Sequence, residues 1–284
     1  MYLLAISGGP DSIFLLKKYA KKNILVAHVN YNMRNDSNID QQIVESFCKE
    51  NNIKYFILDI KETPPKQNFQ NWARETRYNF FKKIYDQNNC TKLLTGHHKD
   101  DFLESALMQN RANREPKYFG IKDKQYLYGM KIHRPFIKRY WKHEILRYLN
   151  DNNINFAIDK TNDMPIYDRN KIRIEIKKMS FSEKKDLFGW FVLSNKILVK
   201  KYKKVEKLFE LWKETEYNLR FFRTQKYKKE MVFEYIHNNF EGVKLSSNKI
   251  SSIVDFIVSP EGGKIFKLDE NNSITKKKEF LIII

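Results

Sequence analysis

The first half of the chain alternates short apolar runs with longer stretches in which apolar residues recur at helical spacing. Between the second and third runs, for example, Ile39, Ile43 and Phe47 repeat every four residues, which is typical of an amphipathic helix. The apolar runs predict four buried strands: Tyr2–Ile6, Ile24–Asn30, Tyr55–Asp59 and Lys92–Gly96. Strands that alternate with helices indicate right-handed parallel crossovers. The pattern therefore predicts an α/β fold with a doubly wound, mostly parallel sheet.

The pattern changes near residue 180. Glycine and proline become sparse, and lysine-rich, aromatic-containing stretches such as Phe188–Glu216 have helical spacing. We therefore expect a first domain over residues 1–178 and a second, mainly helical domain over residues 179–284.

Charge and cysteine content narrow the possible functions. The chain has 53 Lys and Arg against 34 Asp and Glu, a net charge of +19, which favours a polyanionic partner such as nucleic acid. Cys48 and Cys90 are too far apart in sequence for a closely spaced metal or redox pair. The first strand begins at Tyr2, and no apolar stretch reaches the roughly 20 residues of a membrane span. We expect a cytoplasmic protein with no membrane partner.

A glycine-containing loop, Ser7-Gly8-Gly9-Pro10-Asp11-Ser12, joins the first strand to the first helix. Adjacent glycines permit positive φ and let a phosphate approach the backbone closely. The following helix directs its free N–H groups and the positive end of its dipole to the same place. The loop therefore predicts a phosphate-binding site, and the alternative interpretation is an ordinary turn capped by Ser12.

A second polar cluster runs from Thr95 to Ser105, at the end of the fourth strand and the start of a helix. Asp101 and Glu104 are three residues apart and share a helix face, and His97 and His98 lie just before them. This spacing predicts an acidic, imidazole-lined site close to the phosphate loop. The competing interpretations are carboxylates that stabilise the helix N-terminus and a His/Asp metal site.

Taken together, the motifs resemble the tRNA(Ile)-lysidine synthetase family of PP-loop ATP pyrophosphatases. Besides the two clusters above, the resemblance rests on His28–Arg34, on Asn68–Tyr78 with its A-R-x-x-R-Y motif, on Arg134-Pro135-Phe136, on Asp159–Asn162 and on Tyr167–Arg173. It covers about residues 1–178 and implies a short form that lacks a third domain. The chain departs from the family at Tyr31, where histidine is usual, at Ser105, where threonine is usual, and over Asn110–Arg114, where a glycine-bearing segment is usual.

The resemblance implies a ligase that forms a carbon–nitrogen bond. ATP would adenylate the C2 oxygen of the wobble cytidine in the isoleucine tRNA with a CAU anticodon, and pyrophosphate would leave. Free L-lysine would then displace AMP to give lysidine, while the basic second domain docks the tRNA. The implied catalytic residues are Asp11, Asp101, Glu104, His98, Arg169 and Arg173. The implied ATP-binding residues are Ser7, Gly8, Gly9, Pro10, Asp11, Ser12, Asn30 and Arg74, and Mg²⁺ would bind Asp11 and Asp101.

The sequence leaves two alternative functions open. One is another PP-loop enzyme that acts on tRNA, such as a thiolase, although sulfur transfer normally uses closely placed cysteines. The other is a non-catalytic RNA-binding protein built on a degenerate nucleotide fold. Retention of every polar group in both the phosphate loop and the acidic cluster favours the enzyme.

Overall fold

The computed structural model describes residues 1–33, 37–62, 65, 67–112, 116–157, 168–260 and 262–284. The chain divides into two compact units, residues 1–113 with 118–192, and residues 114–117 with 193–284. Helix α7 (Phe181–Glu214) contains the division at Val192. The sequence pattern changes near residue 179, but the first turns of α7 belong to the first unit because Phe188 and Phe191 pack against Phe102.

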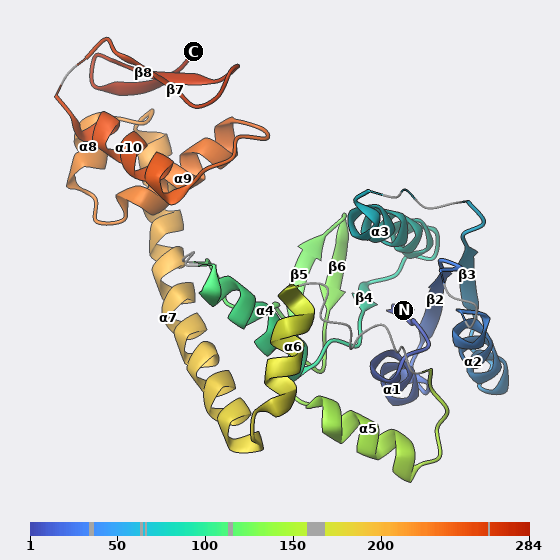
Figure 1. The fold of residues 1–284 in the computed structure, drawn as a ribbon. Helices are drawn as coiled ribbons and strands as arrows, with labels where there is room; N and C mark the ends of the chain where they lie inside the picture. Colours follow the sequence, from blue (N-terminus) through green and yellow to red (C-terminus); the bar gives the residue numbers. More distant parts are fainter. Residues whose placement is uncertain (34–36, 63–64, 66, 113–115, 158–167, 261) are drawn as a thin grey trace. The chain divides into compact units, whose positions relative to one another are not determined.

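The first unit is built on a six-stranded sheet in the order β3-β2-β1-β4-β6-β5 (Figure 1). All neighbouring strands are parallel except β5 and β6, which form an antiparallel pair at one edge. The predicted α/β fold with a mostly parallel sheet is therefore confirmed. The strands are β1 (Tyr2–Ala5), β2 (Ile24–Asn30), β3 (Tyr55–Asp59), β4 (Lys92–Leu94), β5 (Lys124–Leu127) and β6 (Met130–His133).

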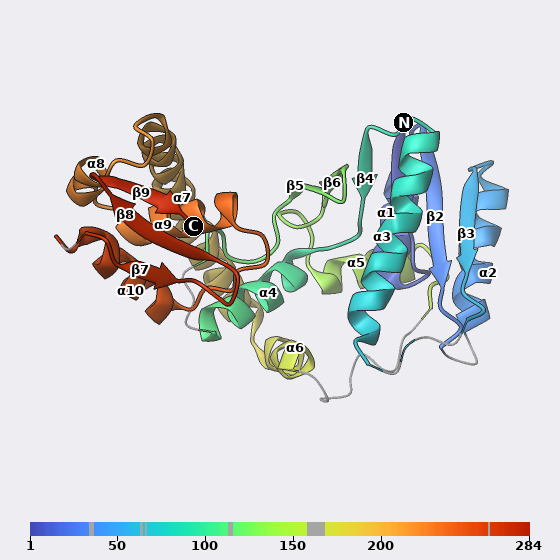
Figure 2. The same ribbon diagram turned by 90° about the horizontal axis from the view of Figure 1, so that it is seen from above.

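Helices cover both faces of the sheet because successive strand residues point to opposite sides. Leu3 and Leu4 are both fully buried, but they belong to different core clusters. On one side, Phe14 anchors the packing of α1 and α5, and on the other side Phe81 of α3 packs on the strands (Figure 2). The helices of this unit are α1 (Pro10–Tyr19), α2 (Ser37–Glu50), α3 (Phe69–Gln87), α4 (Lys99–Arg111), α5 (Lys142–Asp151) and α6 (Asp168–Lys178).

The order of the strands decides where a ligand can bind. The chain leaves β1 for β2 and β3 on one side and returns with β4 on the other side of β1. In open α/β sheets, ligands bind at such a switch point, beyond the carboxyl ends of the strands. Because β1 and β4 pair directly, with Leu4 opposite Leu94, the loops that follow them are neighbours. The predicted convergence of the Ser7 and His97 motifs is confirmed.

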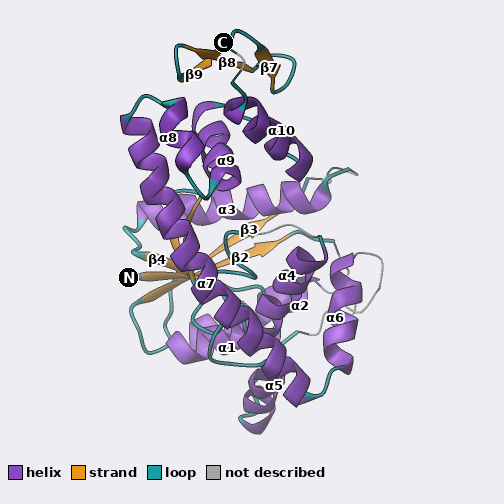
Figure 3. Ribbon diagram, turned by 90° about the vertical axis from the view of Figure 1, so that its left-hand side faces the viewer, coloured by secondary structure: helices purple, strands orange, loops and turns teal. Residues whose placement is uncertain are grey.

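The second unit contains most of α7, three shorter helices and a small antiparallel sheet (Figure 3). Its core includes Trp212, Phe222 and Tyr235, each at most 1% exposed. The mainly helical character agrees with the sequence pattern. The further elements are α8 (Leu219–Thr224), α9 (Lys228–Asn239), α10 (Ser247–Val258), β7 (Ile265–Lys267), β8 (Ser273–Lys277) and β9 (Phe280–Ile283). Across the described residues, no helix is both long and apolar enough to cross a membrane.

Candidate active site

The loop after β1 is closed by its two serines. The Ser12 hydroxyl donates to the Gly9 carbonyl at 2.8 Å, and the Ser7 backbone N–H donates to Ser12 Oγ at 3.1 Å. Gly8 has a φ of +88°, which favours glycine, whereas Gly9 is the N-cap of α1 with a φ of −72°. Only one of the two glycines therefore uses positive φ. The loop and the start of α1 form the expected backbone cradle for an anion.

Gly96, in the loop after β4, packs directly against the backbone of this cradle. A Cβ at Gly96 would lie 2.6 Å from the Asp11 carbonyl oxygen and 3.1 Å from the Ser12 backbone nitrogen. Such a close approach leaves no room for a side chain. The two neighbouring loops therefore fix one another, and the absence of a side chain at residue 96 sets the position of the phosphate loop.

His98 lies at the centre of the acidic cluster. Its Nε2 atom is 3.4 Å from Asp11 Oδ1 and 3.4 Å from Asp101 Oδ2, and its Nδ1 is 3.4 Å from Asp100 Oδ2. The Asp101 carboxylate also accepts the His98 backbone N–H at 2.8 Å, which caps α4. The structure therefore brings together Asp11, His98 and Asp101, as the sequence predicted.

Lys142, at the start of α5, completes the cluster. Its Nζ atom donates to both carboxylate oxygens of Asp11, at 2.7 and 2.8 Å. Its backbone N–H donates to Asp100 Oδ2 at 2.8 Å. Lys142 could not be predicted from the sequence, because 131 residues separate it from Asp11 and no local motif marks it.

These contacts set the charges of the cluster. Burial alone would lower the pKa of His98, but the charge of Asp101 and the close contacts with the Asp100 and Asp11 carboxylates outweigh burial and raise it to about 10. Burial would raise the pKa of Asp11, but His98 and Lys142 lower it to about 2. At neutral pH, His98 is therefore a cation and Asp11 an anion.

Glu104, on α4, is buried and forms ion pairs with two arginines of α6. Its side chain is 3% exposed and contacts Arg169 Nε, while Arg173 Nη2 lies 3.1 Å from its other oxygen. Arg169 is the more exposed of the two arginines, at 49% against 30%. The sequence predicted all three residues for the site, and the structure joins them in one ionic group.

A cavity of about 1120 Å³ connects the phosphate loop with the acidic cluster. This volume exceeds the usual range of about 300–1000 Å³ for a site that holds one small ligand. The cavity has space for ATP together with a second substrate. Of the predicted site residues, those that line it are Ser7, Gly9, Pro10, Asp11, Ser12, Asn30, His98, Asp101, Glu104 and Arg173.

Two polar residues of β2, Asn30 and His28, use their side chains in different ways. Asn30 donates to Asn38 and Gln41 and accepts from the Asn32 backbone, so its amide holds the loop in place. His28 Nδ1 donates to the Ile6 carbonyl at 2.9 Å, and burial lowers the pKa of the ring. The buried Nε2 of His28 has no protein partner in the described structure, although His28 lines the large cavity. Neutral His28 therefore offers this cavity an acceptor that the sequence analysis did not select.

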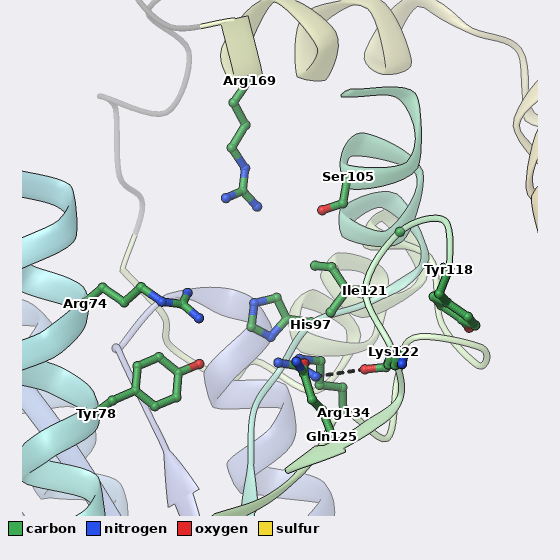
Figure 4. A pocket seen from close by; sticks show the side chains of 11 residues that line it. Arg74, Tyr78, His97, Ser105, Tyr118, Ile121, Lys122, Gln125, Arg134 and Arg169 are labelled. Carbon is green, nitrogen blue, oxygen red and sulfur yellow. Dashed lines mark hydrogen bonds between the residues drawn. The ribbon is translucent and has the colours of Figure 1, made fainter. Parts of the chain in front are cut away.

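Arg74 lies elsewhere. It lines a second, smaller cavity together with His97, Ser105 and Arg169, and it is not among the described residues that line the large one (Figure 4). Its guanidinium packs over Tyr78, 5.0 Å from the ring centroid. The structure therefore does not bring Arg74 to the phosphate loop with the other ATP-site predictions.

Some sequence predictions lie outside the described residues. These are Arg34, the Asp159–Asn162 segment, Tyr167 and the end of the Asn110–Arg114 segment. Among the departures from the family pattern, Tyr31 donates its hydroxyl to the Ala73 carbonyl at 2.6 Å. Tyr31 thus ties the loop after β2 to α3.

Comparison with known proteins identifies the family. A family model of the PP-loop domain matches residues 1–180. The tRNA(Ile)-lysidine synthase of Mycoplasmopsis pulmonis is 40% identical, over 100% of this chain and 99% of that protein. The chain belongs to the tRNA(Ile)-lysidine synthase family. The member from Mycoplasma genitalium is 36% identical, over 100% of this chain and 97% of that protein.

A solved structure agrees with the fold of this lysidine synthase family member. The U34-tRNA thiolase NcsA from Methanococcus maripaludis superposes with a TM-score of 0.54 at 17% identity, over 69% of this chain and 71% of that chain. At this identity the likeness concerns the fold alone. As a member of a PP-loop family that uses ATP, this chain has ATP as a substrate.

Proposed function

We propose that the protein uses ATP to join free L-lysine to C2 of the wobble cytidine of tRNA(Ile) with a CAU anticodon, which yields lysidine. The relatives named above carry the name of this activity over nearly their whole length. The observation that carries the proposal is the large cavity, in which a phosphate cradle and an acidic cluster face one space.

In the first step, the C2 oxygen of cytidine attacks the α-phosphorus of ATP, and the bond to the β-phosphate oxygen breaks to release pyrophosphate. The cradle of Ser7 to Ser12 would hold the departing phosphates. Protonated His98 and Lys142, both in contact with Asp11, place positive charge beside the cradle. Cations fixed where negative charge develops stabilise the transition state. His28 Nε2 would accept a hydrogen bond from an amino or hydroxyl group of ATP.

Mg²⁺ would enter with the ATP phosphates. Mg²⁺ commonly binds one or two carboxylates together with substrate phosphates. Asp11 and Asp101 fit this donor set through their second oxygens, because His98 Nε2 lies near only Oδ1 of Asp11 and only Oδ2 of Asp101. The ion would take the place of the Lys142 ammonium at Asp11 Oδ2. The described residues contain no group of three or more His, Cys, Asp or Glu placed to hold a metal alone. Bound there, the ion would neutralise phosphate charge.

In the second step, a lysine amine attacks C2, and the bond from C2 to the adenylated oxygen breaks to release AMP. The amine must first lose a proton, since an ammonium group has no lone pair. His98 is already protonated, so we assign proton acceptance to Asp101. Glu104 would bind the lysine ammonium in exchange for Arg169, the more exposed of its two arginine partners.

The second unit would dock the tRNA. Four exposed lysines on its part of α7 are spaced by four, three and four residues and therefore share one helix face. This lysine stripe consists of Lys196, Lys200, Lys203 and Lys207. A row of ammonium groups suits the phosphates of an RNA backbone. The neighbouring Lys201 differs, because it pairs with Glu230 at 2.5 Å.

The thiolase alternative has little support from the cysteines. Cys48 and Cys90 are both buried and belong to different core clusters. Burial raises the pKa of Cys48 to about 12 and also raises the pKa of Cys90. Sulfur chemistry requires a thiolate, and neither residue supplies one at neutral pH.

The proposal is tested by incubating the protein with ATP, labelled lysine and a transcript of this tRNA. We expect stable, ATP-dependent label on the tRNA together with release of AMP and pyrophosphate. A transcript in which uridine replaces the wobble cytidine is the control and should remain unlabelled.

A further inference from the structure

The smaller cavity, of about 360 Å³, lies in the first unit and is separate from the ATP cradle. Consecutive residues of the His97–Ser105 segment line different cavities. His97 and Ser105 line the smaller one, whereas His98 and Glu104 line the larger one. The first turns of α4 thus form a wall between the two cavities. The smaller cavity is lined by Arg74, Tyr78, His97, Ser105, Tyr118, Gly120, Ile121, Lys122, Gln125, Arg134 and Arg169.

This lining is strongly cationic. Three arginines and one lysine contribute to it, and none of its described lining residues is a carboxylate. Burial lowers the pKa of His97 to about 4, so this ring remains neutral. The guanidinium groups of Arg74 and Arg169 point toward the space beside His97, where the Tyr78 hydroxyl also lies (Figure 4).

Arg134 is the buried member of this set. It is 5% exposed, and one of its terminal nitrogens donates to the Lys122 carbonyl at 2.8 Å. Its buried Nε has no hydrogen-bond partner, and the described part of the chain places no carboxylate within ion-pair distance of it. Burial lowers the pKa of Arg134, and the nearby Tyr78 hydroxyl and the charge of Asp123 do not offset this effect. A buried guanidinium donor without a partner is costly, and it indicates a site whose anion arrives with a ligand.

The anion comes from one of the substrates. ATP already has the backbone cradle for its phosphates on the other side of the wall, so the choice lies between tRNA phosphate and the carboxylate of lysine. Arg169 already pairs with Glu104, but the three other cationic side chains of the lining still exceed what a single carboxylate needs. The volume, near the lower end of the range of about 300–1000 Å³ for small-ligand sites, suits one nucleotide.

We propose that this cavity, which we name the arginine cavity, binds a backbone phosphate next to the target cytidine, with Arg134 as its buried anchor. The inference rests on the proposed function, since it takes the substrate to be tRNA. Arg134 binds the phosphate through its Nε–H, the buried donor that has no protein partner. Arg74 and Arg169 close on the phosphate from the two other sides, and the cytidine is thereby held against the wall that faces ATP.

The test measures steady-state kinetics of lysine incorporation for Arg134→Met and Arg74→Met, with Arg147→Met as the matched control. Arg147 is an exposed arginine of α5 and lines neither cavity. Arg74 is also exposed, so its replacement keeps the core intact if Arg134→Met fails to fold. We expect the KM for tRNA to rise about 10- to 100-fold in both cavity variants, as for the loss of a charged hydrogen bond. The KM values for ATP and lysine should stay within about twofold.

A chemical version of the test removes the phosphate charge instead. A tRNA with a neutral methylphosphonate at the phosphate on either side of the target cytidine should bind the wild-type protein about tenfold more weakly at one of the two positions. The same tRNA should bind Arg134→Met no more weakly than unmodified tRNA does. Equal losses in both proteins at both positions would refute the assignment.

The remaining outcomes also decide the question. A rise in the KM for lysine alone would assign the arginine cavity to the amino-acid carboxylate, and a rise for ATP alone would assign it to the nucleotide; either overturns the proposal. Unchanged kinetics in both variants overturns it as well. Failure of the proposed function is distinct, because wild-type protein would then transfer no lysine to tRNA at all.

Discussion

Replacing Gly96 with alanine is expected to displace the phosphate cradle, although residue 96 lies outside the Ser7–Ser12 loop that forms it. The new Cβ would lie 2.6 Å from the Asp11 carbonyl oxygen, whereas real Cβ atoms essentially never come within 3.0 Å of another atom. The loop must therefore move by at least about 0.4 Å. The obstructing atoms are backbone and cannot rotate away. Overpacking of this kind costs about 1–3 kcal/mol in the free energy of unfolding.

The functional cost follows from the same displacement. A misplacement of about 1 Å in an active site can reduce the rate about 100-fold, so we expect a fall of roughly tenfold in kcat/KM for ATP. Thermal unfolding should shift downward by about 2–10 °C for the stability loss above. The assays are ATP-dependent lysine incorporation and calorimetry.

Gly189→Ala is the matched control. Residue 189 lies on α7, where an added Cβ would meet nothing within 4 Å. Alanine is favoured over glycine in helices by up to about 1 kcal/mol, so this variant should be as stable as wild type or more stable. A Gly96→Ala protein with wild-type ATP kinetics would refute the claim that contact between the loops positions the cradle.

Three further outcomes are expected. Glu104→Ala should raise the KM for lysine at least tenfold while tRNA-dependent pyrophosphate release persists; equal loss of both would place Glu104 in the first step. Serine at all four positions of the lysine stripe should weaken tRNA binding and flatten its salt dependence by up to about one unit of log–log slope per lost contact. The matched control for the stripe replaces Lys244, Lys267, Lys277 and Lys278 with serine. An unchanged salt dependence of tRNA binding in the stripe variant would mean that the tRNA docks on another surface. Protonated His98 stabilises the folded state fully below its ordinary pKa of 6.5, and this stabilisation is lost as the pH rises to about 10. In urea unfolding, the free energy of unfolding should therefore decline more steeply over this pH range for wild type than for His98→Gln.

The parts of the site that are contiguous in sequence could be predicted. The loop from Ser7 to Ser12 and the cluster from His97 to Glu104 each carry their chemistry within a few residues. Their convergence followed from the alternation of strands and helices, because parallel strands place the loops after them at one edge of the sheet.

Residues that act through distant contacts could not be predicted in the same way. Lys142 contacts Asp11 although 131 residues separate the two in sequence. Arg134 is distinguished by its buried Nε without a partner, and no local sequence motif indicates this. The protonation of His98 depends on three carboxylates that only the folded chain assembles. The short strands β5 to β8 lack a long apolar run, since most of their residues are exposed or half-buried.

Lysidine formation by this protein is tested most directly by the fate of labelled lysine. Purified protein is incubated with ATP, labelled L-lysine and the tRNA(Ile) transcript with a CAU anticodon, and the tRNA is then digested to nucleosides. If the protein forms lysidine, the label appears in one modified cytidine, with one AMP and one pyrophosphate released for each lysine joined. Label that stays entirely in free lysine while the tRNA binds tightly would contradict lysidine formation and would identify an RNA-binding protein without this activity.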